Sequence, residues 1–203
     1  MLKVYGMSTS GNCHKVRMVL AALKLPYAWE EIDTREGTTR MPEFLAKNPN
    51  GQVPLLEIDS GVYLPESNAI VFYLAEGSDL LPNGRLQRAQ VLQWLFFEQY
   101  SHEPYIAVAR FLRTLHRDPG SQRALADSKM DGGYRALGVM EQRLSKESFL
   151  VGGRYTIADI ALYAYTHVAH EAQLDLAPYP GVRRWLERVA GQPRHVPITY
   201  QPD

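Results

Sequence analysis

The sequence predicts a small α/β domain followed by an all-α helical domain. Strand-like and helix-like spacings of apolar residues alternate along residues 1–76, which is typical of an α/β unit. From residue 86 the strand signal disappears, and apolar residues recur at the three- and four-residue spacing of helices. The stretch GSDLLPNG, rich in turn-forming residues, lies between the two patterns. We therefore expect a first domain over 1–76, a linker over 77–85 and a helical domain over 86–203.

The first domain is expected to contain four strands and at least two helices. Apolar or alternating runs predict strands at 2–5, 27–33, 53–58 and 62–64. Helical spacing predicts helices at 11–24 and 66–76 and a short helical piece at 41–47. Pro26 ends the first helix. The order strand, helix, strand at the start of the chain predicts a right-handed crossover and a parallel pair of strands, and the last two strands are expected to form a hairpin.

The second domain is expected to consist of helices alone. Helical patterns cover 86–116, 121–144, 157–168 and 181–189. Pro104 is expected to kink the first of these helices, and the pair Gly132-Gly133 to interrupt the second. Thr156 and Asp159 have the spacing of a capping box, which predicts the start of the third helix.

Composition excludes several classes of function. The chain has 22 Lys and Arg against 22 Asp and Glu, so no basic surplus points to nucleic acid or to an anionic membrane. No segment has the length of a membrane span or the pattern of a signal peptide, and we expect a soluble, cytoplasmic protein. The single cysteine, Cys13, excludes an internal disulfide and a thiolate metal site. The histidines lack ligand spacing, so no metal is expected.

Three motifs, taken in order, point to a family. STSGNCHKVR (8–17) opens the first helix, NPNGQVP (48–54) leads into the third strand, and PESNAIVFYLAE (65–76) holds the last helix of the first domain. Together with TIAD in the helical domain, this set resembles the soluble glutathione transferases, of the bacterial serine type that is similar to the zeta, theta and delta classes. The resemblance implies a thioredoxin-like N-terminal domain, glutathione as co-substrate, an electrophile pocket built largely by the helical domain, and a homodimer.

The same resemblance implies roles in glutathione binding. The Val53–Pro54 bond matches the position of a cis proline, where the Val53 backbone pairs with the cysteinyl part of glutathione. The Ser67 hydroxyl and N–H match the group that binds the γ-glutamyl carboxylate, and Glu66 would face the ammonium group, although both residues also suit a plain helix cap. The remaining positions are polar residues near the ligand: Gln52, and toward the glycine end Thr39 and Arg40.

Many relatives carry His or Gln at the place of Thr39, so this contact stays open. A solvated surface position is an equal alternative for Arg40. In the helical domain, Tyr105 and Arg110 are further candidates for the border of the electrophile pocket.

The chemistry requires that the glutathione thiol lose its proton near neutral pH, because the thiolate is the nucleophile. A hydroxyl that donates to sulfur at a helix N-terminus stabilises the thiolate. Ser10 matches the catalytic serine of the resembled classes. Asn12 is the second candidate, because some bacterial relatives contact sulfur with an asparagine, and Ser8 is the third. Cys13 falls one turn into the helix, where we expect it to face the core.

We therefore expect an enzyme, a glutathione transferase that conjugates glutathione to a small hydrophobic electrophile, with Ser10 stabilising the thiolate. Three alternatives remain open from the sequence. The first is a glutathione-dependent isomerase similar to maleylacetoacetate isomerase, whose Ser-Ser-Cys run differs from Ser-Gly-Asn-Cys in this chain. The second is a glutathione-dependent disulfide reductase, which Asn12 suggests. The third belongs to a different class: a protein that binds glutathione or other ligands without catalysis.

Overall fold

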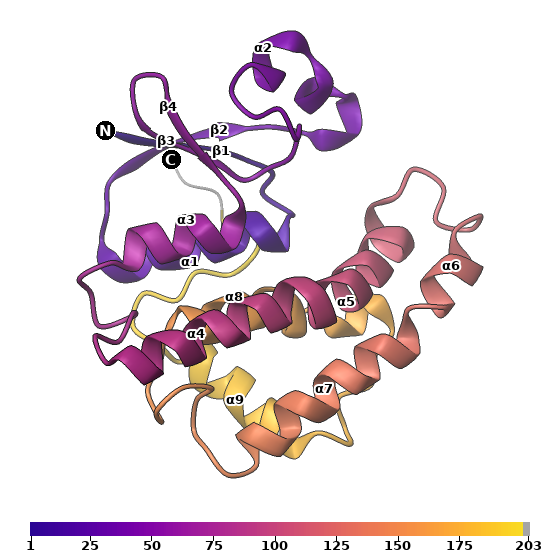
Figure 1. Ribbon diagram of the computed structural model, residues 1–203. Helices are drawn as coiled ribbons and strands as arrows, with labels where there is room; N and C mark the ends of the chain where they lie inside the picture. Colours follow the sequence, from indigo (N-terminus) through magenta and orange to yellow (C-terminus); the bar gives the residue numbers. More distant parts are fainter. Residues whose placement is uncertain (201–203) are drawn as a thin grey trace. The chain divides into compact units, whose positions relative to one another are not determined.

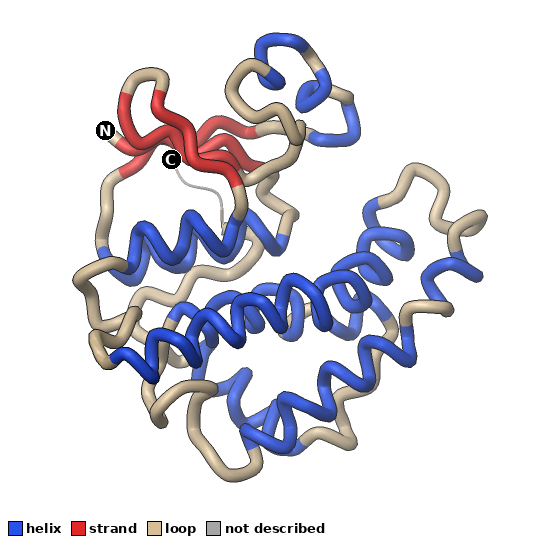
Figure 2. Tube along the Cα trace, in the orientation of Figure 1, coloured by secondary structure: helices blue, strands red, loops and turns tan. Residues whose placement is uncertain are grey.

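The computed structural model describes residues 1–200, and the chain divides into two compact units. Of these described residues, the first unit contains Met1–Ser78 and residues 193–200, and the second contains Asp79–Gln192. In Figure 2 the red strands all belong to the first unit, and blue helices make up most of the second. The expected fold class, a thioredoxin-like α/β domain and an all-α domain, is therefore confirmed.

A four-stranded sheet with the order β2-β1-β3-β4 forms the centre of the first unit. Its strands are β1 Leu2–Gly6, β2 Tyr27–Glu31, β3 Leu55–Asp59 and β4 Val62–Pro65. β1 and β2 are parallel, as the crossover through α1 (Gly11–Leu23) requires, and β3 is antiparallel to both β1 and β4. β3 begins two residues later than predicted, since Pro54 has no N–H to contribute to a strand ladder.

Helices cover both faces of this sheet. Figure 1 shows α1 and α3 (Ser67–Ala75) side by side on one face, and the short helix α2 (Pro42–Leu45) on the other side. On the α2 side the ring of Tyr5 meets the ring of Phe44 edge-on, with centroids 6.4 Å apart. Ile32 and Leu55 complete this buried cluster. Two 3-10 turns, Thr34–Glu36 and Thr38–Arg40, connect β2 to α2.

The segment 193–200 returns to the first unit and so differs from the expectation that it belongs to the helical domain. It is bound to α1 through side chains that meet its backbone carbonyls. His14 Nε2 donates to the Val196 carbonyl at 2.7 Å, and the buried guanidinium of Arg17 donates to the carbonyls of Ile198 and Tyr200. The segment has no regular secondary structure, so the spacing of its residues carried no signal of this return. Residues 201–203, also expected in the helical domain, lie outside the described residues.

The second unit is built from helices that agree with the predicted pattern in most places. They are α4 Arg85–Phe97, α5 Glu103–Arg110, α6 Arg123–Asp127, α7 Met130–Leu144, α8 Ile157–Thr166 and α9 Pro180–Ala190. The predicted helix over 86–116 contains two π-helical stretches, Glu98–His102 and Phe111–Leu115. The first stretch directly precedes α5, and Pro104 lies in the first turn of α5. The regular α-helical hydrogen bonding is interrupted there because proline has no N–H to donate to the preceding turn.

The capping box at the start of α8 is confirmed, and it extends into a buried hydrogen-bond network around Asp159. Its Oδ2 accepts from the Thr156 N–H at 2.9 Å, while its Oδ1 accepts from the Leu150 N–H at 3.0 Å and from Trp185 Nε1 at 2.9 Å. Trp185 belongs to α9 and is fully buried. One carboxylate therefore joins the start of α8 to α9 and to the loop before α8.

The predicted interruption at Gly132-Gly133 is wrong, because both glycines lie inside α7. The break falls earlier, at Ser128 and Lys129, between α6 and α7. A Cβ atom at Gly132 would overlap the ring of Tyr105 from α5. Gly132 is therefore needed for the close approach of two helices and not for a turn.

We expect Gly132→Ala to lower the free energy of unfolding by about 1–3 kcal/mol, because the added methyl group forces Tyr105 out of its position. Gly138→Ala in the same helix is the matched control, because a Cβ added there would meet nothing within 4 Å apart from its chain neighbours and the backbone of its own helix. This control is expected to raise stability by about 0.5–1 kcal/mol through helix propensity. Urea denaturation measures both changes, and two variants of equal stability would contradict the packing argument.

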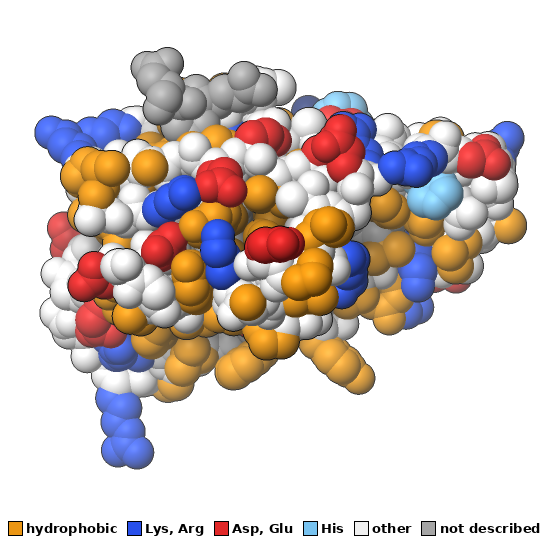
Figure 3. Space-filling model, turned by 90° about the horizontal axis from the view of Figure 1, so that it is seen from above, with side chains coloured by type: hydrophobic (Ala, Val, Ile, Leu, Met, Phe, Trp, Pro, Cys, Tyr) orange, Lys and Arg blue, Asp and Glu red, His pale blue; other side chains and the backbone are white. Residues whose placement is uncertain are grey.

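The surface carries charges of both signs. On the face seen in Figure 3, Lys and Arg side chains are interspersed with Asp, Glu and hydrophobic side chains. This mixture agrees with the balanced composition of 22 Lys and Arg against 22 Asp and Glu. Within residues 1–200, no helix combines the length and the apolar character needed to cross a bilayer.

Candidate functional site

The register of the sheet brings the three sequence motifs to one end of the first unit. Tyr5 of β1 lies opposite Leu55 of β3, and Leu55 lies opposite Pro65 of β4. Because β3 is antiparallel to both neighbours, the segment after β1, the segment before β3 and the segment after β4 emerge at the same end of the sheet. These segments are the 8–10 loop, the Val53–Pro54 pair and the Glu66–Ser67 pair.

Ser10 occupies the N-cap of α1, a 13-residue helix. Its backbone is extended, and its Oγ accepts a hydrogen bond of 3.3 Å from the Cys13 N–H. This contact uses Oγ as an acceptor, so the hydroxyl hydrogen can be directed to another acceptor. The N-terminus of the helix adds a positive partial charge at the same place.

Cys13 is fully buried, in agreement with the expectation that it faces the core. Burial raises the pKa of its thiol to about 11, although the Met7 N–H and the Ser10 hydroxyl favour the thiolate. Cys13 is therefore a buried core thiol whose surroundings disfavour the reactive thiolate.

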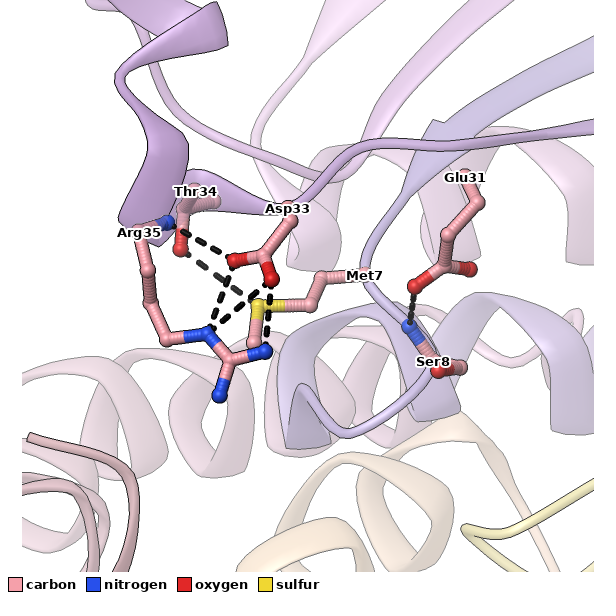
Figure 4. Close-up of polar contacts among 6 residues, drawn as sticks. All are labelled: Met7, Ser8, Glu31, Asp33, Thr34 and Arg35. Carbon is pink, nitrogen blue, oxygen red and sulfur yellow. Dashed lines mark hydrogen bonds and ion pairs between the residues drawn. The ribbon is translucent and has the colours of Figure 1, made fainter.

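Two charged side chains hold the backbone of the 8–10 loop. The Ser8 N–H donates to Glu31 Oε1 at 2.8 Å, and the Ser8 carbonyl accepts from Arg17 at 2.7 Å. Figure 4 shows Glu31 reaching Ser8 from β2, with Thr34 donating to the sulfur of Met7 nearby. The loop that leads to Ser10 is thus fixed in place by the backbone contacts of Ser8.

The Glu66–Ser67 pair begins α3 in a strained conformation. Glu66 has φ 70° and ψ 110°, a region that residues with a side chain rarely adopt. Such strain is concentrated at sites that bind ligands. Ser67 is buried, and its hydroxyl donates to Asn12 Oδ1 at 3.3 Å and accepts from Lys15 Nζ at 3.3 Å. Asn12 and Ser67, predicted from separate motifs, are therefore in direct contact.

The peptide bond between Val53 and Pro54 is cis, as the resemblance implied. The preceding Gln52 has an exposed side chain, and its carbonyl accepts from Asn48 Nδ2 at 2.9 Å. Asn48 is buried, so the backbone just before the cis bond is anchored to the interior of the unit.

Thr39 and Arg40 pack against this same loop. The Arg40 guanidinium donates to the Asn50 carbonyl at 3.1 Å. A Cβ atom on Gly51 would lie 2.8 Å from the Thr39 carbonyl, so the two loops touch backbone to backbone. Thr39 is buried and Arg40 is exposed. Of these two candidates, only the Arg40 side chain is accessible to a ligand in this structure.

Comparison with known proteins then decides the family. Residues 1–76 match the family model described as the N-terminal domain of glutathione S-transferase, and residues 92–193 match the model of its C-terminal domain. The chain belongs to the glutathione S-transferase family.

Solved structures and curated relatives of this family agree over nearly the whole chain. A glutathione S-transferase from Pseudomonas fluorescens Pf-5 is 54% identical, with a TM-score of 0.94 over 97% of this chain and 98% of that one. Ure2p in complex with glutathione is 26% identical, with a TM-score of 0.83 over 96% and 90% of the two chains. The disulfide-bond oxidoreductase YfcG of Escherichia coli is 32% identical over 189 residues, which cover 90% of this chain and 87% of the relative.

The helical unit of this glutathione S-transferase family member contains a cavity of about 210 Å³. Tyr105 lines it together with Phe97, Ser101, Gly132, Arg135, Ala136 and Val139. Arg110, the other residue expected near an electrophile pocket, is not among the lining residues. Its Nε instead forms an ion pair of 2.8 Å with Glu171, and its side chain is almost fully buried.

Three charged residues of the first unit that were not predicted as part of the site contact the candidate loop or Ser67: Lys15, Arg17 and Glu31. A signal for Lys15 was present, because it lies three positions after Asn12 and so shares a helix face with it. Glu31 and Arg17 gave no such signal, since each meets a backbone group of Ser8. Among residues 1–200, no group of three or more His, Cys, Asp or Glu side chains is arranged to hold a metal ion.

Proposed function

We propose that this protein is a serine-type glutathione transferase in which the Ser10 hydroxyl donates a hydrogen bond to the thiolate of bound glutathione. The observation that carries the proposal is the position of Ser10 at the N-terminus of α1, at the end of the sheet where the other two motifs also emerge. A hydroxyl and a helix N-terminus both favour a negative charge on sulfur, and together they lower the pKa of the thiol.

In the proposed reaction, the thiol proton passes to solvent and the sulfur keeps its electron pair. The thiolate attacks an electrophilic carbon, a C–S bond forms, and the leaving group departs with the bonding electrons, as halide when the substrate is an aryl halide. Ser10 acts by hydrogen bonding alone and forms no covalent bond. Its Oγ accepts from the Cys13 N–H, and the hydroxyl hydrogen is a separate donor that can be directed to the sulfur.

The remaining candidate residues would hold the peptide. The Ser67 hydroxyl and N–H would bind the γ-glutamyl carboxylate at the N-terminus of α3, and Glu66 would face the ammonium group. The Val53 backbone would pair with the cysteinyl part as an added strand, with Gln52 beside it. At the glycine end, the exposed Arg40 suits a carboxylate better than the buried Thr39.

A glutathione-dependent disulfide reductase is the second candidate function. It is favoured by the 32% identity with a disulfide-bond oxidoreductase and by the position of Asn12 in the first turn of α1. In that case the activated sulfur of glutathione would attack a disulfide sulfur, and a second glutathione would complete the reduction.

Parallel assays with an aryl halide, with hydroxyethyl disulfide and with maleylacetoacetate separate these functions. We expect a higher kcat/KM for conjugation of the aryl halide. A preference for the disulfide supports the reductase, and turnover of maleylacetoacetate alone supports the isomerase. Retention on immobilised glutathione without turnover of any substrate supports a binding protein. Failure to bind glutathione contradicts all four.

We also propose that the protein forms a homodimer. Large apolar side chains are exposed along α4 and the π-helical stretch that follows it, where Phe96 is 71% and Tyr100 is 84% exposed. An apolar stripe of this kind is typical of an interface. Static light scattering is expected to give twice the mass of the 23.0 kDa chain, and a monomer contradicts the proposal.

We also propose a cytoplasmic location for this glutathione transferase, since a lone buried cysteine suits a reducing compartment.

A further inference from the structure

Lys15 is a fully buried lysine at the candidate site. It lies on α1 three residues after Asn12, and its Nζ is 3.3 Å from the hydroxyl oxygen of Ser67. Lysine is rarely buried completely, because removing its charge from water is unfavourable. A buried lysine that contacts a candidate ligand-binding serine therefore calls for a functional explanation.

The contact with Lys15 decides the direction of the hydrogen bonds of Ser67. An ammonium group can only donate, so the Ser67 oxygen accepts from Lys15 and the single hydroxyl hydrogen points elsewhere. In this structure it points to Asn12 Oδ1, at 3.3 Å. An oxygen acceptor that binds at Ser67 would receive the same hydrogen.

The charge of Lys15 also acts directly on a bound anion. In the protein interior the effective dielectric constant is lower than in water, so a buried cation attracts a nearby anion more strongly than an exposed cation does. The N-terminus of α3 adds a partial positive charge at the same serine. Both effects favour a negatively charged group at Ser67 over a neutral one.

We propose that Lys15 is the specificity-determining residue that makes the Ser67 end of the site select a carboxylate. The proposal rests on the proposed function, in which the γ-glutamyl carboxylate binds at Ser67. Lys15 acts through Ser67 and through its charge, so it is a positioning residue and not a catalytic one.

The test compares two ligands by titration calorimetry. One is glutathione, and the other is 4-aminobutanoyl-cysteinyl-glycine, which keeps the ammonium group and lacks the γ-glutamyl carboxylate. We expect Lys15→Met to weaken glutathione binding by at least about tenfold and to change binding of the analogue by less than about twofold. Lys15→Gln, which can still donate to Ser67 without a charge, is expected to resemble Lys15→Met.

Lys24→Met is the matched control, because it removes the same charge from the exposed C-terminal end of the same helix. This control is expected to leave both affinities unchanged. An equal loss of affinity for both ligands in the Lys15 variants would reveal a packing role and overturn the proposal, as would no loss for either ligand.

Two further outcomes are distinguishable. If the unaltered protein does not bind glutathione, the proposed function fails before Lys15 is tested. If neither Lys15 variant folds, the preference of the unaltered protein for glutathione over the analogue still tests the selection of a carboxylate at Ser67 on which the proposal depends. We expect this preference to be at least about thirtyfold, and a preference below about threefold overturns the proposal.

Discussion

Ser10→Ala is expected to lower kcat/KM for conjugation of an aryl halide by about 10²–10³-fold, as when a donor to a developing negative charge is removed. The variant loses the hydroxyl that is proposed to stabilise the thiolate, and the thiol of bound glutathione should then titrate nearer its free pKa of about 8.5. The pH dependence of kcat/KM and the ultraviolet absorbance of the bound thiolate measure this change.

The effect on activity can be separated from an effect on folding. Ser10 also caps α1, so its replacement by alanine is expected to reduce stability by about 1 kcal/mol, which leaves the protein folded. Thr9→Ala removes the neighbouring exposed hydroxyl and should retain activity within about twofold. If Ser10→Ala keeps the activity and the thiol titration of the unaltered protein, Ser10 is only a cap, and Asn12 becomes the residue to test.

The largest loss of stability is expected from Asp159→Ala, at least about 3 kcal/mol. The Asp159 carboxylate accepts hydrogen bonds from Leu150, Thr156 and Trp185, all buried, and alanine leaves these donors without an acceptor. Asp175→Ala is the matched control in the same unit, because this exposed carboxylate accepts from one backbone N–H, that of Ala177. A similar small loss in both variants, measured by urea denaturation, would contradict the role assigned to Asp159.

Asp159 also gives stability a dependence on pH. Burial raises the pKa of its carboxyl group from 3.8 to about 6, against the opposing effect of the hydrogen bonds that it accepts. The folded protein therefore binds a proton that the unfolded chain has released, in the window between these two values. This stabilising contribution is fully present below 3.8 and is lost as the pH rises through about 6.

Comparison with Asp159→Asn isolates this contribution, because the other titrating groups are shared. Between about pH 7 and about pH 4, the unaltered protein should gain about 2–3 kcal/mol in unfolding free energy relative to the Asn variant. A difference that stays constant over this range would mean that the carboxyl group titrates normally.

Local structure could be predicted from the sequence wherever neighbouring residues determine it. The crossover pair β1 and β2, the hairpin of β3 and β4, and the capping box at Thr156 and Asp159 all follow from spacing and capping chemistry. The candidate site was predicted in outline, since Ser10, Val53 and Ser67 each belong to a short motif. The cis bond at Val53–Pro54 came from the resemblance, because spacing alone does not distinguish it from a trans bond.

Contacts between distant parts of the chain could not be predicted in this way. Gly132 was interpreted as a helix break because glycine has a low helix propensity, but it lies inside α7, and the close approach of Tyr105 explains why a glycine is needed there. Lys15 meets Ser67 across 52 positions, and Arg17 meets Ile198 across 181. Such contacts depend on which surfaces the fold brings together, and periodicity holds no information about that.

The contacts of Arg17 have a consequence for biosynthesis. A ribosome that has translated the first 78 residues has produced all four strands of the sheet, but it still has to translate the entire second unit before Ile198 and Tyr200 exist. The nascent sheet can form early, whereas the guanidinium that contacts Ser8 acquires its partners Ile198 and Tyr200 only after the second unit has been translated. Maturation of the loop before Ser10 is thus coupled to completion of the helical unit.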